Sequence, residues 1–509
     1  MLGSLPLGVT PIVTPDVDWL AISPVIALAA AGILIVLSKA LLRGHRAAMP
    51  VAVVLAFAGV IAAGVLEFVL WNDVHDDGPI TTVAGMVRVD LFGVFLGVVV
   101  VIATFLAVLL SIAYLRREGL ESSEYLGLLL LSGAGMLAMT TANDLIVVFL
   151  ALEVLSIPLY VLAAFDRRRA SSQEAGIKYF VLGAFSSAVF LYGVALTYGA
   201  TGTTSLTGIH DFLAQNTLLE QGTLLAGFAL LLVGLGFKVA AVPFHMWTPD
   251  VYQGAPTPIT AFMSAAVKAA AFAALLRVFG VAFPLYSTDW KPAIATLSVL
   301  SLVVGSVAAV VQTDIKRMLA YSSIAHAGYV LMGFADNTAR GREAALFYLF
   351  VYTFMSIGAF AVITLATRKG DDSHELDDYR GLALRRPVLG GFLIFFVLAQ
   401  AGIPLTGGFV AKLEIFSATA RAEQYGLLIV GVLAAVVTAF FYLRIAMTLL
   451  SSPEGDAEMP AEEPGRSVVL RRVDACSAVV LVATGVMVLW IGVAPDTFVQ
   501  WARDATFLL

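Results

Sequence analysis

Four ionisable side chains lie inside stretches of sequence that are otherwise apolar. They are Glu153 in "VVFLALEVLSIPLYVLAAF", Lys238 in "GLGFKVAAVPFHMW", Lys268 in "AFMSAAVKAAAFAALL" and Lys412 in "AGIPLTGGFVAKLEIF". At the centre of a lipid bilayer each would cost about 2.5–3.5 kcal/mol on insertion scales. A membrane helix needs only apolar residues to be stable, so these four side chains indicate a function at membrane depth.

The chemistry that a buried lysine performs most readily is the storage and release of a proton. Burial favours the neutral amine, whereas a carboxylate at about 4 Å stabilises the charged form by roughly 4 kcal/mol at an effective dielectric constant near 20. A glutamate–lysine pair that opens and closes would therefore load and unload a proton, and Glu153 with Lys238 is the predicted pair. The alternative is a structural ion pair that fixes the register of two helices, and the sequence leaves it open.

Three further residues are candidates for passing protons on. His245 and His326 carry imidazoles, which titrate near neutrality, but a lone buried histidine is as often a hydrogen-bonded core residue. Lys178 lies near the end of an apolar segment, where its side chain could simply extend to the membrane surface. The sequence contains no metal-ligand spacing, nucleophile elbow, P-loop or dinucleotide fingerprint. We therefore expect no metal site and no catalytic redox residue.

The elements that must hold these side chains are membrane helices. Of the 509 residues, 60% are hydrophobic and 13% are charged, and the mean hydropathy is +0.93, which is typical of a polytopic membrane protein. The net charge of −6 does not suggest a nucleic acid as partner. Because Cys476 is the single cysteine, neither a disulfide nor a thiolate-bound iron–sulfur cluster can form within this chain alone. Any redox chemistry must therefore lie outside this chain.

Hydropathy predicts about fourteen transmembrane helices, each long enough to cross roughly 30 Å of hydrocarbon. The predicted ranges are 18–41, 50–71, 91–115, 125–142, 144–165, 175–200, 221–250, 256–281, 292–311, 316–335, 343–367, 388–418, 424–450 and 474–496. Lysine and arginine are most frequent in the loops that follow odd-numbered helices, so the positive-inside rule places those loops in the cytoplasm and both termini outside. The loop 368–387 is expected to be accessible from the cytoplasm, and the acidic stretch 451–466 is expected to be a solvated connection.

Two of the predicted helices contain a break next to a lysine. Pro243 follows Lys238 within the seventh helix, and Pro404 precedes Lys412 within the twelfth, where Gly407 and Gly408 also loosen the following turn. Interrupted hydrophobic segments in corresponding halves are typical of transporters that are built from inverted repeats around a midplane ion path. We therefore predict two five-helix repeats, from the fourth to the eighth helix and from the ninth to the thirteenth.

Four segments of the sequence resemble one known family. The segments "FKVAAVPFHMWTPDVYQGAPTPITAF", "DIKRMLAYSSIAHAGYVLMG", "AGIPLTGGFVAKLEIF" and "ALEVLSIPLYVLAAF" are similar to the N-type membrane subunits of bacterial proton-pumping NADH–quinone oxidoreductase, respiratory complex I. The resemblance extends from about residue 91 to about residue 450. It implies fourteen helices, inverted five-helix repeats and discontinuous seventh and twelfth helices.

The resemblance also implies roles for single residues. Glu153 matches the family's fifth-helix glutamate, Lys238 its paired lysine, Lys268 the lysine of the central hydrophilic axis, and Lys412 the lysine on the outlet side. FMN, iron–sulfur clusters and quinone are then expected in partner subunits, with none bound by this chain. The partners are expected to be other membrane subunits, including related antiporter-like ones, and the location the bacterial inner membrane.

These inferences predict an all-α polytopic protein with four parts. Residues 1–120 would form the first three helices, 121–285 the first repeat, 286–450 the second repeat, and 451–509 a cytoplasmic loop and the last helix. The predicted function is proton translocation as a subunit of an NADH–quinone oxidoreductase, without a redox centre in this chain. Two alternatives remain open: a cation/proton antiporter subunit, and a structural membrane subunit of a redox complex.

Overall fold

The computed structural model describes residues 16–42, 47–218, 221–367, 370–371, 374–452 and 473–506, and within them the chain is mostly helical. Residues 453–472, which include most of the predicted acidic loop, lie outside the described residues. So do Arg368 and Lys369, two of the basic residues used to orient the chain. The predicted sides of the membrane therefore stay a prediction.

The N-terminal part of the chain contains three long helices and one small hairpin. These elements are α1 (Trp19–Leu41), α2 (Ala48–Asp77), β1 (Ile80–Thr82), β2 (Val87–Val89) and α3 (Leu91–Glu118). The strands pair antiparallel with Ile80 opposite Val89. The hairpin is a departure from the all-α expectation, because a pair of strands only three residues long has no clear periodicity in the sequence.

The middle of the chain continues with helices and one interruption. It contains α4 (Ser123–Thr140), α5 (Leu145–Ala163), α6 (Ala170–Thr201), α7 (Leu206–Gln215), α8 (Gly222–Val239) and α9 (Trp247–Gly254). A continuous helical segment, Thr257–Ala282, follows and is built from α10 (Thr257–Phe262), the π-helical turn η1 (Met263–Val267), α11 (Lys268–Arg277) and the π-helical turn η2 (Val278–Ala282). We refer to this segment as the central helix.

The C-terminal part is also built of helices with one interruption. It contains η3 (Pro284–Tyr286), α12 (Ser287–Val310), α13 (Ile315–Phe334), α14 (Ala339–Ala366), η4 (Leu376–Tyr379), α15 (Leu382–Arg385), α16 (Pro387–Ala401), α17 (Gly407–Arg421), α18 (Tyr425–Leu450), α19 (Ala475–Val493) and α20 (Asp496–Asp504). In both predicted repeats the fourth predicted helix is the interrupted one, as α8 with α9 and as α16 with α17. The repeat boundaries remain a prediction.

Each of the fourteen predicted ranges coincides with helical structure. Among the described residues, twelve helices are long and apolar enough to cross a membrane. The two predicted ranges outside that set are α13, whose first turn contains Lys316 and Arg317, and the interrupted pair of α16 and α17. The multi-pass helical architecture is therefore confirmed, and the count of fourteen crossings stays a prediction.

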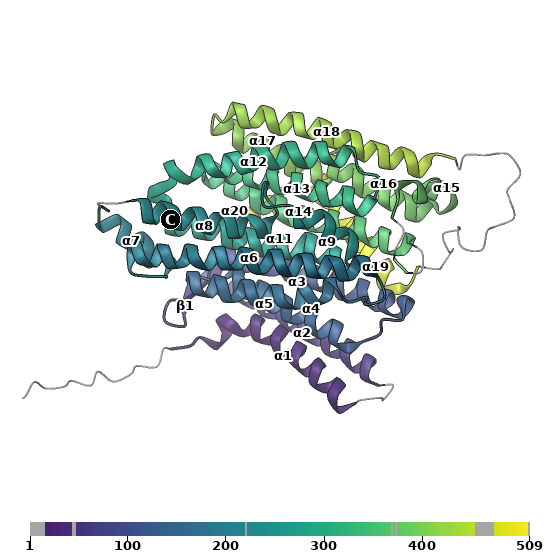
Figure 1. The fold of residues 1–509 in the computed structure, drawn as a ribbon, viewed down its shortest axis with the longest axis horizontal. Coiled ribbons are helices and arrows are strands. Elements are labelled where there is room, and N and C mark those ends of the chain that lie inside the picture. Colours follow the sequence, from purple (N-terminus) through teal and green to yellow (C-terminus); the bar gives the residue numbers. More distant parts are fainter. Residues whose placement is uncertain are drawn as a thin grey trace, which may run out of the picture.

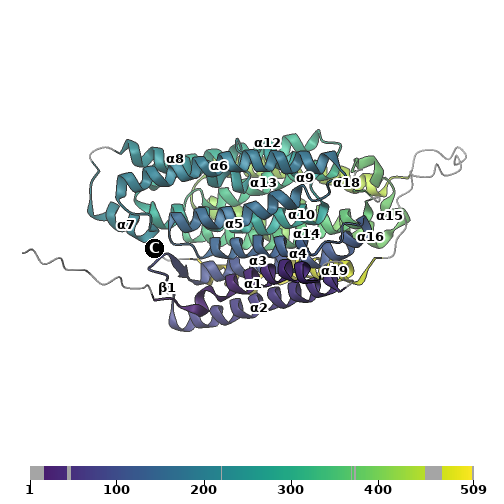
Figure 2. The ribbon, with the colours of Figure 1, turned by 60° about the horizontal axis from the view of Figure 1, so that its bottom comes forward.

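The helices lie side by side along one common direction (Figures 1 and 2). In both views α1 and α2 form one edge of the bundle, and α12 lies on the opposite side (Figures 1 and 2). The central helix and α14 occupy the interior, because the most apolar window of each is entirely buried, whereas only a third of the corresponding windows of α1 and α2 is buried. The lysine of the central helix is thus enclosed by protein.

Aspartates begin several of the helices. Their carboxylates accept hydrogen bonds from backbone N–H groups in the first helical turn, which otherwise lack partners. These capping residues are Asp18, Asp90, Asp144, Asp314 and Asp474. Polar residues at helix starts and apolar residues between them explain why the hydropathy pattern located the helices.

Candidate functional site

The first helix break begins immediately after Lys238. The helix α8 ends at Val239, and Ala240 adopts a left-handed conformation with a φ of 62°. Two hydrogen bonds close the end of the helix, from the N–H of Ala240 to the carbonyl of Phe237 at 3.1 Å and from the N–H of Ala241 to Gly236 at 2.8 Å. The break therefore starts before Pro243, which lies within the link 240–246.

Two side chains from other elements stabilise this break. The indole of Trp247 donates to the carbonyl of Phe237 at 2.9 Å, and the N–H of Val242 donates to the hydroxyl of Ser301 on α12 at 2.9 Å. Backbone groups freed inside a membrane are costly unless they find such partners. Lys238 is consequently held at the carbonyl end of α8, where the helix dipole favours a positive charge.

Lys238 is surrounded by hydroxyl groups and aromatic rings. Its ammonium donates to the hydroxyl of Ser156 on α5 at 2.8 Å and to that of Tyr179 on α6 at 3.2 Å. It lies 5.1 Å from the centre of the Tyr179 ring and 5.9 Å from that of Tyr160, and the residue is only 3% exposed. Lys238 is thus surrounded by neutral hydroxyl acceptors and aromatic faces, and no carboxylate contacts it directly.

Glu153 lies one helical turn before Ser156 on α5, and it acts on Lys238 electrostatically from beyond ion-pair distance. One carboxylate oxygen of Glu153 is buried without a hydrogen-bond partner. In this conformation Glu153 and Lys238 therefore do not form the predicted ion pair at about 4 Å. The Lys238 nitrogen donates to the hydroxyls of Ser156 and Tyr179 instead.

Lys268 is the first residue after the π-helical turn η1. Its ammonium donates to the hydroxyl of Ser323 on α13 at 2.5 Å and also to the Ser323 carbonyl. The ring of Tyr352 on α14 lies 5.7 Å away. π-helical turns inside α-helices frequently occur at functional sites, and this one aims Lys268 at α13.

His326, one turn after Ser323 on α13, connects three helices. Its Nδ1 lies 2.6 Å from the hydroxyl of Tyr348 on α14, and its Nε2 lies 3.0 Å from the hydroxyl of Tyr442 on α18. The Tyr442 hydroxyl also donates to the side chain of Gln400 on α16 at 3.1 Å. The imidazole therefore lies in a continuous set of side-chain hydrogen bonds.

The second break resembles the first in its hydrogen bonding. The helix α16 ends at Ala401, Gly402 follows it with a φ of 92°, and the N–H of Ile403 donates to the carbonyl of Leu398 at 3.2 Å. A Cβ on Gly408 would come within 1.9 Å of the Ala399 carbonyl oxygen, so this glycine permits α17 to approach α16 closely. The expectation that Gly408 loosens the helix was wrong, since α17 is helical from Gly407.

Lys412 reaches across this break. Its ammonium donates to the carbonyl of Ala401, the last residue of α16, at 2.8 Å. It also lies 5.3 Å from the ring of Tyr329, which is one turn after His326 on α13. One face of α13 therefore carries a row of side chains three residues apart, Ser323, His326 and Tyr329. Lys268 contacts the first of them and Lys412 lies beside the last.

An aromatic stack lies between Lys238 and this row. Tyr179 stacks on Trp247 with ring centres 4.6 Å apart, and Trp247 meets the edge of Tyr252 at 6.1 Å. Tyr252 in turn lies beside Ser323. The described structure thus places Lys238, Lys268 and Lys412 along one series of side chains. The portion of the series that follows Lys238 is less polar than the rest.

Two of the candidate relay residues lie outside this series. Lys178 pairs with Asp250 at 2.7 Å and with Glu174 at 2.6 Å, and its side chain is 40% exposed. His245 lies in the first break, with its ring centre 6.5 Å from that of Tyr321 and a buried Nδ1 that has no hydrogen-bond partner. His326 is the candidate relay that the structure joins to the lysines.

Sequence reasoning missed the neutral members of the series, which are Ser156, Tyr179, Ser323, Tyr329, Gln400 and Tyr442. The spacing of Ser323, His326 and Tyr329 in "SIAHAGY" was a usable signal, since residues three apart share one face of a helix. Within the described residues no group of three or more histidine, cysteine, aspartate or glutamate side chains could hold a metal ion.

Comparisons with known proteins give consistent results. Residues 142–438 match the family described as "NADH:quinone oxidoreductase/Mrp antiporter, TM". The NADH-quinone oxidoreductase subunit N of Trichlorobacter lovleyi is 42% identical over 89% of this chain and 90% of its own length. The protein of the same name from Mycobacterium tuberculosis is 42% identical over 97% of this chain and 99% of its own.

Solved structures show the same architecture. A chain of respiratory complex I from Thermus thermophilus with bound aureothin has 34% identity and a TM-score of 0.77, covering 94% of this chain and 99% of that one. A chain of the Mrp complex from Dietzia is 23% identical with a TM-score of 0.82, covering 96% of each chain, and shows likeness of fold alone.

Proposed function

The chain belongs to the NADH:quinone oxidoreductase/Mrp antiporter family, as a proton-translocating membrane subunit of NADH–quinone oxidoreductase, and we propose that protons cross it by way of Lys238, Lys268, His326 and Lys412. The observation that carries this proposal is the row on α13. Ser323 accepts from Lys268, His326 lies one turn further, and Tyr329 lies against Lys412.

Each lysine in this path holds a proton in one state and releases it in the next. When Glu153 moves towards Lys238, its charge favours the ammonium form, and when it withdraws, burial favours the neutral amine. In the structure, where Glu153 lies beyond ion-pair distance, the Lys238 nitrogen donates to the hydroxyls of Ser156 and Tyr179. The pair thereby binds a proton at one moment and releases it at another.

Transfer from Lys268 to Lys412 uses the hydroxyl and imidazole groups between them. The Ser323 hydroxyl accepts from Lys268, and the His326 ring can receive a proton on one nitrogen while the other nitrogen releases one to a tyrosine hydroxyl. The aromatic stack of Tyr179, Trp247 and Tyr252 separates Lys238 from this portion and opposes free proton leakage.

The oxidoreductase reaction itself takes place elsewhere in the complex. We propose that FMN, the iron–sulfur clusters and quinone are bound by partner subunits, and that related antiporter-like subunits are neighbours of this one in the bacterial inner membrane. Both termini would lie on the outer side. The contribution of this chain is to move the proton.

The test of the path is a comparison of Lys268→Ala with the parent protein in vesicles containing the assembled complex. We expect NADH oxidation to continue while fewer protons are pumped per electron, because only proton transfer passes through Lys268. Unchanged pumping by this variant would contradict the path.

The alternative function is that of a cation/proton antiporter subunit, for which the likeness of fold to the Mrp complex is the relevant observation. If pumping by the complex required added sodium, that result would favour this alternative.

A further inference from the structure

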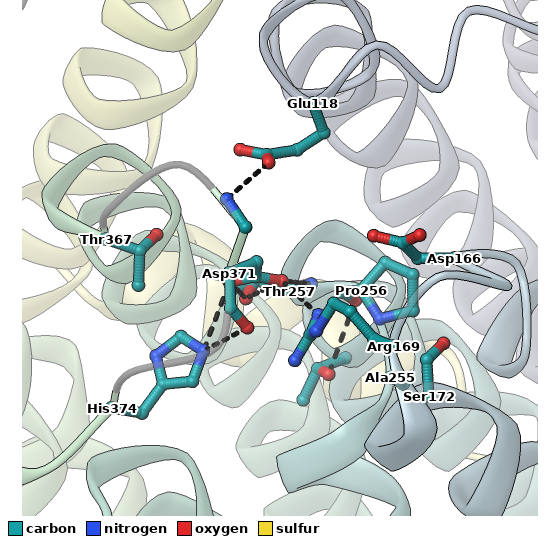
Figure 3. A network of polar contacts seen from close by, with 12 residues as sticks. Glu118, Asp166, Arg169, Ser172, Ala255, Pro256, Thr257, Thr367, Asp371 and His374 are labelled. Atoms are coloured by element: carbon teal, nitrogen blue, oxygen red, sulfur yellow. Dashed lines mark hydrogen bonds and ion pairs between the residues drawn. The ribbon is translucent and has the colours of Figure 1, made fainter.

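A second buried group of charged side chains lies away from the proposed proton path, at the opposite end of the central helix from Arg277. It consists of Tyr114, Arg169, Thr257, Lys316, Asp371 and His374, and we call it the Asp371 cluster. Figure 3 shows Asp371 at its centre, with His374 on one side and Arg169 and Thr257 on the other. The side chain of Asp371 is 0% exposed.

Asp371 binds the first residue of the central helix from outside that helix. Its carboxylate accepts the N–H of Thr257 at 3.1 Å and the Thr257 hydroxyl at 2.8 and 3.0 Å. An N-terminal backbone N–H of a helix has no partner within the helix, and the helix dipole favours a negative charge there. Asp371 therefore caps the helix that carries Lys268, although the two residues lie 103 positions apart in the sequence.

Positive and polar groups from three other elements hold the carboxylate in place. Tyr114 of α3 donates to it at 2.9 Å, Arg169 lies 3.4 Å away, and His374 lies 3.1 Å away. Lys316 of α13 is fully buried and donates to the carbonyl of Ala255 at 2.7 Å, two residues before the helix begins. The start of the central helix is thus bound through both Ala255 and Thr257.

The charge state of Asp371 follows from these neighbours. Burial alone would raise the pKa of its carboxyl, but the charge of Lys316, the hydrogen bond and charge of His374, and Arg169 hold that pKa well below its usual range. The carboxylate is consequently ionised at neutral pH.

The loop that carries Asp371 is itself fixed to the end of α3. The N–H of Gly370 donates to Glu118 at 2.7 Å, and Glu118 pairs with Arg117 at 2.6 Å. Arg117 also donates to the carbonyl of Thr364 in the last turn of α14. The cluster therefore joins α14, of the second predicted repeat, to α3 and to the central helix of the first.

The other end of the central helix has an ion pair of its own. Arg277 donates to the two carboxylate oxygens of Asp90 at 2.8 and 2.7 Å and to the carbonyl of Thr140 at 3.0 Å. Lys268 lies between the two attached ends, nine residues before Arg277 and eleven after Thr257. Its position relative to Ser323 depends on both attachments.

We propose that Asp371 is a positioning residue for proton transfer: by capping the central helix from the loop after α14, it keeps Lys268 within hydrogen-bond distance of Ser323. The inference rests on the proposed path through Lys268. A shift of the helix by a fraction of one turn would part Lys268 from the α13 row, because a hydrogen bond does not extend beyond about 3.5 Å.

The test measures protons pumped per electron in vesicles, normalised to the amount of assembled complex. For Asp371→Asn we expect pumping per electron to fall by about 2- to 30-fold, the range in which substitutions remote from a site change coupling, with NADH oxidation retained. Thr257→Val, which removes the hydroxyl bonds and keeps the N–H bond, should give a smaller fall. Asp377→Asn is the matched control, since that carboxylate lies near the same loop and is 81% exposed.

Moving the carboxylate from Asp371 to the helix start distinguishes a positioning role of Asp371 from a role in stability alone. In the double variant Asp371→Asn with Thr257→Asp, a carboxylate returns to the helix start from within the helix, so pumping per electron should recover towards the parent value. Parent-like pumping by Asp371→Asn would overturn the inference. If Asp371→Asn fails to assemble, parent-like pumping by Thr257→Val would overturn the inference in its place. Parent-like pumping by Lys268→Ala would instead refute the proposed path, so the two failures are distinguishable.

Discussion

The ammonium group of Lys412 donates a hydrogen bond to the carbonyl oxygen of Ala401, across the break between α17 and α16. Ala401 is the last residue of α16, so the lysine lies at the negative end of that helix dipole. A charged lysine is therefore stabilised without a carboxylate. A neutral amine could keep the hydrogen bond but would lose the attraction between its charge and the helix dipole.

Lys412→Arg and Lys412→Met should have similar effects on pumping. Arginine remains charged because its pKa is above about 12, so it can occupy the site and cannot release a proton, whereas methionine carries none. We expect both variants to assemble and both to lose most proton pumping per electron. The measurement is pumping together with the amount of assembled complex. Full pumping by the arginine variant would make Lys412 a structural charge.

Glu153→Gln should impair pumping, and Glu153→Asp should retain part of it, because only a carboxylate changes the charge preference of Lys238. The amide keeps the shape of the side chain and loses its charge. Glu174→Gln is the matched control: Glu174 also pairs with a lysine, but its side chain is 63% exposed. If glutamine functions as well as glutamate while alanine fails, Glu153 contributes packing alone.

Tyr442→Phe should slow proton transfer between His326 and the second break. The variant keeps the ring and removes a hydroxyl that contacts His326, Gln400 and Ser322. Positioned proton-transfer groups contribute about 100-fold or more to rate, so a fall of pumping by at least about tenfold is expected if no other group replaces the hydroxyl. Tyr425→Phe, at a residue that is 58% exposed, should pump normally. Equal pumping by the two variants would remove Tyr442 from the path.

The helices and both breaks could be predicted because they depend on local properties of the sequence. Apolar stretches of sufficient length and the placement of proline and glycine are visible without any tertiary contact. The first break begins three residues before Pro243, because Ala240 adopts a left-handed conformation that the sequence alone does not indicate. That conformation depends on partners such as Trp247 and Ser301, which come from outside α8.

The candidate site could be predicted only in its charged members. A lysine in an apolar stretch stands out, whereas a serine or tyrosine there does not, so Ser156 and Tyr442 were missed. Lys316 lies in the first turn of α13 and is fully buried, which the sequence alone does not indicate. The loop 368–387 was expected to be accessible from the cytoplasm, and that orientation stays a prediction. Within the loop Asp371 and His374 are buried, because a sequence does not show whether the charges of a loop face water or each other.

The predicted orientation can be tested at an exposed position of that loop. A cysteine introduced at Asp377, in a protein whose Cys476 has been replaced by serine, should react with a membrane-impermeant maleimide in inverted vesicles. Asp377 is suitable because its side chain is 81% exposed and forms one surface pair with Arg380. Labelling of intact cells would place the loop, and with it the odd-numbered loops, on the outer side.

The stability that Asp371 provides should be independent of pH near neutrality. Its folded-state pKa lies well below the unfolded value of about 3.9, so the stabilisation is present above about pH 4 and is lost as the pH falls through the folded-state pKa. We expect Asp371→Asn to lower the temperature at which the solubilised complex releases this subunit by the same amount at pH 8 as at pH 6. A difference that disappears between these two values would indicate that the carboxyl titrates near neutrality.

The central helix and α14 have mean hydropathies of 1.8 and 2.1 in windows that are entirely buried in the protein. Lipid does not contact these windows in the folded subunit, and polar groups are accommodated there, as the hydrogen bond between Ser264 and Ser356 shows. During biosynthesis, however, each segment must partition from the translocon into the bilayer on its own hydrophobicity. The apolar composition of these two helices therefore satisfies a requirement of insertion, and substitutions that make them more polar should impair insertion before any folded contact forms.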